Sequence, residues 1–175
     1  MLENRLLRLE ATIRRFGMIA AMILIPALML ARLTEIITRY LNTPGSIYNA
    51  MESELFLLFV FMTIAAAYAG DHHVRVDIFR DRMGPRLRAW VEIIGTAFFI
   101  LPFAAIVLWY GSILTGIVWS DGERSAIALG APTRFLIIGA MPLGIALFLT
   151  IALSRMARAI LFLRGHAADP LERSI

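Results

Sequence analysis

The histidines are the residues whose type most readily suggests chemistry in this chain, because imidazole binds haem and metal ions. His72 and His73 are adjacent, and His166 lies in a polar C-terminal stretch. On a helix, adjacent side chains point about 100° apart, whereas a b-type haem in a helical bundle takes imidazoles from two facing helices. Asp71, His73 and Asp77 combine metal-binding residue types, but a hydrogen-bonded helix–loop junction is the commoner role. The sequence therefore predicts no haem and no metal site.

The sequence also shows no combination of residues that is typical of a catalytic site. The chain has no Cys, and all of its basic residues other than His are Arg. The absence of Cys excludes thiolate metal sites, iron–sulfur clusters and covalently attached c-type haem. The absence of Lys excludes a phosphate-loop lysine and lysine Schiff-base chemistry. No nucleophile–base pair or paired carboxylate is evident, so we expect no enzyme activity and no cofactor.

Charged residues near the ends of the apolar runs suggest ion pairing or docking and not catalysis. Arg32, Glu35 and Arg39 recur at i, i+3 and i+7, on one face of a predicted helix, and can form a ladder of ion pairs. Interfacial pairing is the commoner explanation, and a docking surface for an external partner is the alternative. Glu92 lies near the start of an apolar run, where we expect it to reach water or Arg88.

The elements that position these residues are predicted to be transmembrane helices. The chain is 59% hydrophobic and 17% charged, with a mean hydropathy of +0.76, while soluble domains are about half apolar and a quarter charged. A hydrocarbon core of about 30 Å needs about 20 apolar residues per helix. We predict an all-α integral membrane protein with four transmembrane helices. They span about 16–38, 52–70, 90–119 and 126–154, the third with a tilt or a kink near Pro102.

The arginines orient these helices. Most of the 17 basic residues lie in the N-terminal segment, between the second and third helices, or in the C-terminal tail. The positive-inside rule therefore places both termini and the middle loop in the cytoplasm. The net charge of +4 is explained by this orientation, so it does not indicate a nucleic-acid partner.

The chain is predicted to be a single membrane domain, residues 1–175, with a cytoplasmic tail over 155–175. The first 15 residues are predicted to form an amphipathic helix, since leucines and other apolar residues recur there at spacings of three and four. This segment either lies along the cytoplasmic membrane surface or extends the first transmembrane helix. Its two acidic residues argue against a cleavable signal peptide.

Small residues recur at the spacing that lets membrane helices approach closely. These candidate helix-packing positions are Ala66 and Gly70, Ser112 and Gly116, and Ala140 and Gly144. Helices with several small-residue faces and almost no polar interior are typical of a subunit that packs against another membrane protein.

Three groups of residues carry a resemblance to a known family. They are Arg39-Tyr40-Leu41-Asn42 with Pro44, Glu52, Glu54 and Ala66-Ala67-Tyr68-Ala69; His73-Val74-Arg75-Val76-Asp77-Ile78-Phe79; and Met141-Pro142-Leu143-Gly144. In order and spacing, over about residues 32–155, they resemble the small permease subunit of tripartite ATP-independent periplasmic (TRAP) transporters, the DctQ-like family.

The resemblance implies a multi-pass subunit of a bacterial inner membrane. Such transporters import organic acids, including C4-dicarboxylates, by symport driven by an ion gradient. The implied partners are a large DctM-like permease subunit, a periplasmic DctP-like substrate-binding protein and membrane lipid. The small subunit would brace the large one, while Arg39, Glu52 and Glu54 would help to dock the binding protein. His73 and Asp77, on the cytoplasmic side, are interpreted as structural.

Two other classes of protein remain open. One is a haem-carrying membrane anchor of a respiratory enzyme, which would show a Soret absorbance band. The other is a self-sufficient small carrier or channel, which would produce flux in liposomes that contain this chain alone.

Overall fold

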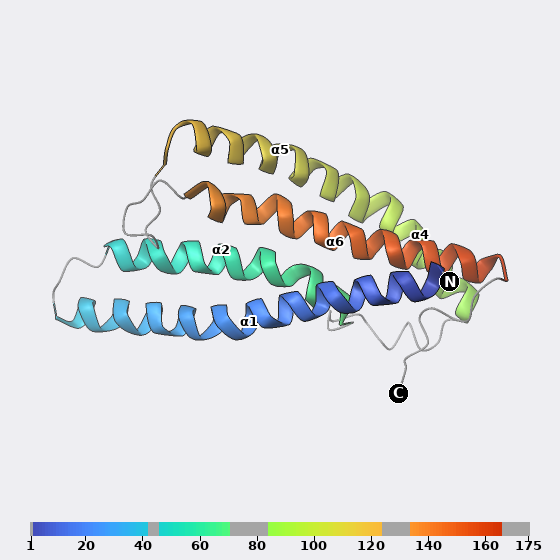
Figure 1. Ribbon diagram of the computed structural model, residues 1–175, viewed down its shortest axis with the longest axis horizontal. Coiled ribbons are helices and arrows are strands. Elements are labelled where there is room, and N and C mark those ends of the chain that lie inside the picture. Colours follow the sequence, from blue (N-terminus) through green and yellow to red (C-terminus); the bar gives the residue numbers. More distant parts are fainter. Residues whose placement is uncertain (1, 42–45, 71–83, 124–133, 166–175) are drawn as a thin grey trace.

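Helices form every regular element in the part of the chain that the structure describes. The structure is a computed structural model, and it describes residues 2–41, 46–70, 84–123 and 134–165. The elements are α1 (Leu2–Tyr40), α2 (Ser46–Ala69), α4 (Pro85–Gly95), a π-helical turn η1 (Thr96–Ile100), α5 (Leu101–Ser120) and α6 (Arg134–Leu163). Because α4, η1 and α5 follow one another directly, they make one long segment (Figure 1). Four segments are thus long and apolar enough to cross a membrane, as predicted.

The four segments lie side by side in the order α1, α2, α6, α5 (Figure 1). Helices α2 and α6 are central, and α1 and α5 each flank one of them. The hydrophobic core lies where α2 meets α6, around Ala65, Tyr68, Ile151 and Ala152. Because α1 and α5 each have a single main neighbour, both leave a broad apolar face exposed.

Two glycines allow the central helices to approach their neighbours closely. A Cβ atom added at Gly144 of α6 would collide with the carbonyl group of Phe61 on α2. A Cβ atom added at Gly17 of α1 would collide with the Cβ of Ala66. Backbones this close are typical of membrane helices, whose association depends on van der Waals packing.

Helix α1 is unbroken from Leu2, so the first 15 residues continue the first predicted transmembrane helix, one of the two expected arrangements. The helix bounds differ from the predicted ones at three places. Helix α2 begins at Ser46, α4 begins at Pro85, and α6 continues to Leu163, which shortens the tail predicted from residue 155. The last difference arises because Arg155 and Arg158 are buried against other helices, an environment that their charge does not reveal. The predicted start of the fourth helix, at 126, lies outside the described residues.

The irregularity expected near Pro102 takes the form of a π-helical turn. The turn η1 ends directly before α5, and the Leu101 N–H bonds to the Thr96 carbonyl five residues earlier. Proline cannot donate a backbone hydrogen bond, and single π-turns are a recognised way for a helix to absorb such an interruption.

Candidate functional site

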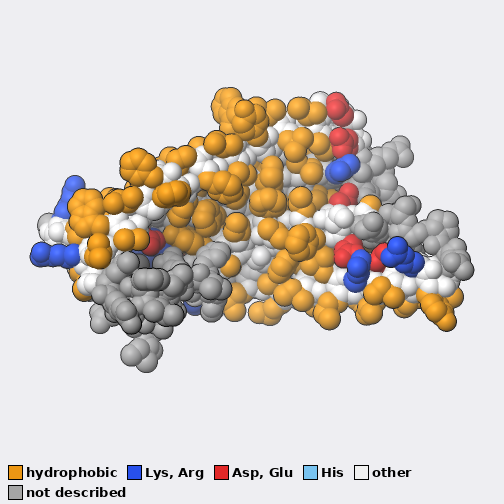
Figure 2. Space-filling view, turned by 180° about the vertical axis from the view of Figure 1, so that it is seen from behind, with side chains coloured by type: hydrophobic (Ala, Val, Ile, Leu, Met, Phe, Trp, Pro, Cys, Tyr) orange, Lys and Arg blue, Asp and Glu red, His pale blue; other side chains and the backbone are white. Residues whose placement is uncertain are grey.

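Among the residues that the structure describes, charged side chains are confined to the two ends of the molecule. We call the outer end the one where α1 and α5 finish and α2 and α6 begin, and the inner end the opposite one (Figure 1). Between these ends, residues 16–31, 55–70, 93–120 and 135–154 contain no Asp, Glu, Lys or Arg. Figure 2 shows the same separation on one face, where a hydrophobic band lies between charged ends. Each end is a candidate functional site.

One group of ion pairs at the outer end connects α1 to α2. Arg32 Nη1 lies 2.7 Å from Glu35 Oε2 and 2.9 Å from Glu52 Oε2. The ladder predicted on α1 is thus present between Arg32 and Glu35, and Glu52 of α2 joins it. The Arg32 side chain remains 55% exposed, so this network faces solvent and contributes little to stability.

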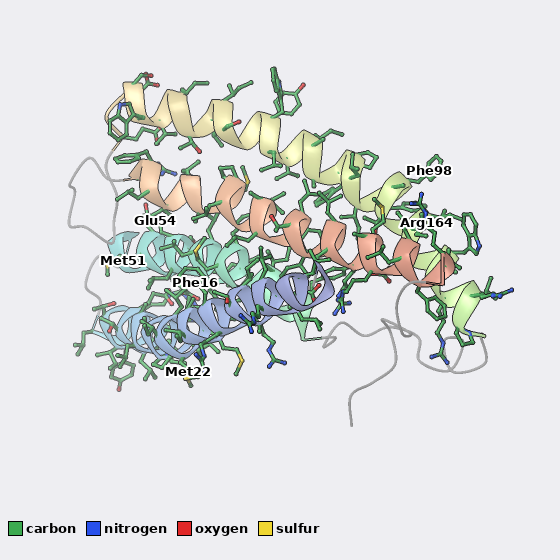
Figure 3. The ribbon with its side chains drawn as sticks, turned by 45° about the vertical axis from the view of Figure 1, so that its right-hand side comes forward. Phe16, Met22, Met51, Glu54, Phe98 and Arg164 are labelled. Carbon is green, nitrogen blue, oxygen red and sulfur yellow. The ribbon has the colours of Figure 1, made fainter. Side chains whose placement is uncertain are left out.

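A second group of ion pairs at the outer end connects α6 to α2 and to the residues that follow α5. Arg134 Nη1 lies 3.0 Å from Glu123 Oε2, and its Nε lies 4.0 Å from Glu54 Oε1. Glu54 projects from the first turns of α2, close to Met51 (Figure 3). Together we call Arg32, Glu35, Glu52, Glu54, Glu123 and Arg134 the outer cluster.

The three residues predicted to dock a periplasmic protein are therefore not equivalent. Glu52 and Glu54 are half-buried and each pairs with an arginine of another helix. Arg39 is exposed in the last turn of α1 and makes no ion pair with the part of the chain that the structure describes. Arg39 thus keeps its charge available to a partner, while the two glutamates position Arg32 and Arg134.

A second polar group, at the inner end, was missed by the sequence reasoning. Glu10 of α1 is only 8% exposed and is surrounded by donors from α6. Ser154 Oγ donates to Glu10 Oε1 at 2.6 Å, and Arg158 Nη2 donates to both carboxylate oxygens at 2.8 Å. A buried carboxylate needs such partners, since desolvation of an unpaired charge is costly.

At the inner end, further polar contacts connect α6 to α2, and α2 to α4. Arg155 Nη2 donates to the Ala69 carbonyl at 3.2 Å, and its guanidinium lies 4.7 Å from the centre of the Tyr68 ring. The Tyr68 hydroxyl donates to Glu92 Oε1 at 2.9 Å. Glu92, which was expected to reach water or Arg88, thus also lies within hydrogen-bond distance of Tyr68 of α2.

We call Glu10, Tyr68, Glu92, Ser154, Arg155 and Arg158 the inner cluster. The sequence contains an indication of this cluster, namely an acidic residue on an apolar helix face. Glu10 shares the helix face of Leu6 and Ile13, which are its i−4 and i+3 neighbours, and Ser154 and Arg158 are four apart on α6. An acidic residue on an apolar face indicates a buried partner, but only the fold shows that this partner is 148 residues away.

The small residues divide into two groups. Ala66, Ala140 and Gly144 are buried, and Gly70 is half-buried, so these positions serve contacts within the chain. Ser112 and Gly116 are exposed on α5, and a Cβ atom at Gly116 would have no neighbour within 4 Å.

His73 and Asp77 lie outside the described residues. Within the described ranges, no group of three His, Cys, Asp or Glu side chains is arranged to hold a metal ion. What the described residues offer is two polar ends joined by apolar helices.

Comparison with protein-family models gives a match over most of the chain. Residues 28–162 match the model described as "Tripartite ATP-independent periplasmic transporters, DctQ component". No curated protein and no solved structure matches the chain. The matched range begins within α1 and includes α2, α4, α5 and nearly all of α6.

Proposed function

Because the chain belongs to the DctQ family, the small membrane components of TRAP transporters in the bacterial inner membrane, we propose that it supports the ion-driven import of an organic acid without carrying the substrate itself. The family operates with a larger permease and a substrate-binding protein. The observation that carries the proposal is the absence of any charged side chain between the two ends of the membrane segments. A transport path for an anion and its coupling ion needs polar groups at membrane depth.

The first part of the proposed role is to brace the large permease subunit. The exposed face of α5 is the best-supported contact, because it combines Ser112 and Gly116 with large apolar side chains. Trp109, three residues before Ser112, and Trp119, three residues after Gly116, are 67% and 64% exposed. Small positions beside aromatic ones give a surface on which another helix can pack closely.

A bulky substitution on this face tests the bracing role. Gly116→Leu should reduce the amount of large subunit that co-purifies, because the added side chain holds a partner helix away. Its matched control is Thr150→Leu, which likewise places a leucine at an exposed position, on α6. Equal recovery of the large subunit with both variants would contradict a contact at this face.

The second part of the proposed role is to seat the periplasmic substrate-binding protein at the outer end. Arg39 is the residue best suited to direct contact, since its guanidinium is exposed and has no ion-pair partner among the described residues. Arg32 and Arg134 also remain about half exposed, at 55% and 45%. Guanidinium groups at an interface rim govern the rate and salt dependence of association.

Arg39→Ala should slow transport about fivefold at limiting binding protein, the size expected for one exposed ion pair. Arg86→Ala is the matched control, because Arg86 is also exposed but lies on α4 at the inner end. The measurement is substrate uptake by the reconstituted transporter as a function of binding-protein concentration.

Substitution of Arg39, Glu52 and Glu54 together should weaken transport further while the two membrane subunits still co-purify. Normal transport by that triple variant would refute the docking role. Loss of co-purification would assign the three residues to assembly instead.

A further inference from the structure

A groove runs between α1 and α2 near the inner end of the molecule. It has a volume of about 480 Å³, and its lining includes Gly17, Ala21, Phe59 and Ala66. Sites that hold small ligands span about 300–1,000 Å³, so the groove is large enough to hold part of one. Gly17 and Ala66 lie where the two helices touch, since a Cβ atom added at Gly17 would meet the Cβ of Ala66, and both belong to the lining of the groove.

Arginine marks one end of this groove. Arg14 belongs to its lining, and Ala21, on the same helix, lies seven residues further toward the membrane centre. At 1.5 Å per residue the groove therefore extends about 10 Å from the guanidinium into the apolar region. A cationic rim that continues into an apolar channel matches a ligand with an anionic head and a hydrocarbon tail.

A second hollow on α1 shares this rim. Its lining includes Thr12, Arg14, Arg15, Met18 and Met22, so Arg14 and Met18 belong to both hollows. Met22 lies on the outward side of α1 (Figure 3). One cationic rim thus leads into two adjacent apolar surfaces, an arrangement suited to a head group with two acyl chains.

The charges at the rim are not used within the described part of the chain. Arg14 and Arg15 are exposed and make no ion pair with the described residues. The nearby carboxylate of Glu10 is buried and bonded to Ser154 and Arg158. By the positive-inside rule this end faces the cytoplasm, where anionic lipid head groups attract juxtamembrane arginines.

We propose that the α1–α2 groove is a binding site for an anionic phospholipid, with the phosphate at Arg14 and Arg15 and an acyl chain along Gly17, Ala21 and Ala66. A flexible acyl chain can adapt its shape to the groove. The phosphate of the head group carries the negative charge that can pair with Arg14 and Arg15. A partner helix in the same groove would have to bring acidic residues to the level of the two arginines. The proposal does not depend on the role of this chain in transport.

The experiment measures lipid binding to the full chain in mild detergent by native mass spectrometry. The probes are phosphatidylglycerol, phosphatidylcholine with the same acyl chains, and glycerol phosphate without acyl chains. The expected result is tighter binding of phosphatidylglycerol than of phosphatidylcholine, with no measurable binding of glycerol phosphate. Each arginine near an anionic head group contributes about a fivefold preference, so Arg14→Gln with Arg15→Gln should remove a preference of about 25-fold.

Two further variants locate the site. Arg86→Gln with Arg164→Gln removes two exposed arginines at the same end, away from the groove, and should keep the preference. Ala21→Leu fills the groove without a change of charge and should weaken the binding of both lipids. The proposal is overturned if Arg14 and Arg15 can be replaced without loss of the preference, or if both arginine pairs contribute equally.

Cross-linking in the membrane distinguishes the lipid from a protein occupant. A photoreactive residue in place of Met18, which borders both hollows, should yield adducts with phospholipid. Capture of the large permease subunit at this position instead would show that a protein covers the groove, and would overturn the proposal.

Discussion

At the scale of single residues, the charges of this chain perform two different tasks. The two arginines of the outer cluster remain about half exposed, and their ion pairs hold them in place at a surface. The inner cluster is buried, and its Glu10–Arg158 pair is almost fully removed from solvent, with side chains 11% and 9% exposed. Exposed pairs contribute little to stability, but removal of one partner from a buried pair strands the other charge.

Arg158→Met should therefore destabilise the protein by about 3 kcal/mol, because Glu10 loses its cationic partner while it remains buried. Thermal unfolding in detergent measures the effect. The matched control is Arg164→Met, since Arg164 is exposed one and a half turns later, just beyond the end of α6, and its loss should change little. Similar unfolding temperatures for the two variants would show that the buried pair does not stabilise the fold.

At the scale of elements, the contact between α2 and α6 is what fixes the arrangement. The two helices approach so closely at Gly144 that a Cβ atom there would meet the Phe61 backbone, which cannot move aside as a flexible side chain can. Not every small residue on these helices makes such a close contact. Gly116, on the exposed face of α5, has open space around it.

The two glycines provide a matched pair of substitutions. Gly144→Ala should destabilise the protein by about 1–3 kcal/mol, the cost typical of overpacking in a close contact. Gly116→Ala should leave the stability of the isolated chain unchanged or slightly higher, because alanine favours helix over glycine. The order of unfolding temperatures of the two variants checks this, and a reversal would place the tight contact elsewhere.

At the scale of the whole molecule, four helical segments in one row leave much of their apolar surface uncovered by the other described residues. Helices α1 and α5 expose long series of large hydrophobic side chains, and both flank the central α2 and α6 (Figure 1). In a membrane these faces are covered by lipid or by other subunits. Between its charged ends, the apolar ranges of this row contain no charged side chain.

Liposomes that contain this chain alone should therefore show no uptake of organic acid above protein-free liposomes. Addition of the large permease subunit and the binding protein should restore uptake, because we propose that the transport path lies in the large subunit. Radiolabelled uptake under an imposed sodium or proton gradient is the measurement. Solute flux through the chain alone would favour a small carrier or channel.

The sequence determined the membrane class, the four spans and the family because these depend on local composition and short motifs. Twenty apolar residues in succession predict a spanning helix wherever they occur. The pairing of Arg32 with Glu35 was equally visible, since residues three apart share a helix face. The continuous α1 was one of two expected arrangements, and the local pattern did not distinguish them.

Only the tertiary structure decided which polar residues are buried and which small residues face a neighbour. Glu10 and Arg158 are far apart in the sequence, and nothing local to either one identifies the other. The pairs Ser112–Gly116 and Ala140–Gly144 have the same spacing, yet the first is exposed and the second is packed against the chain. The physical reason is that spacing defines a face of a helix, while the order in which helices lie side by side defines what that face meets.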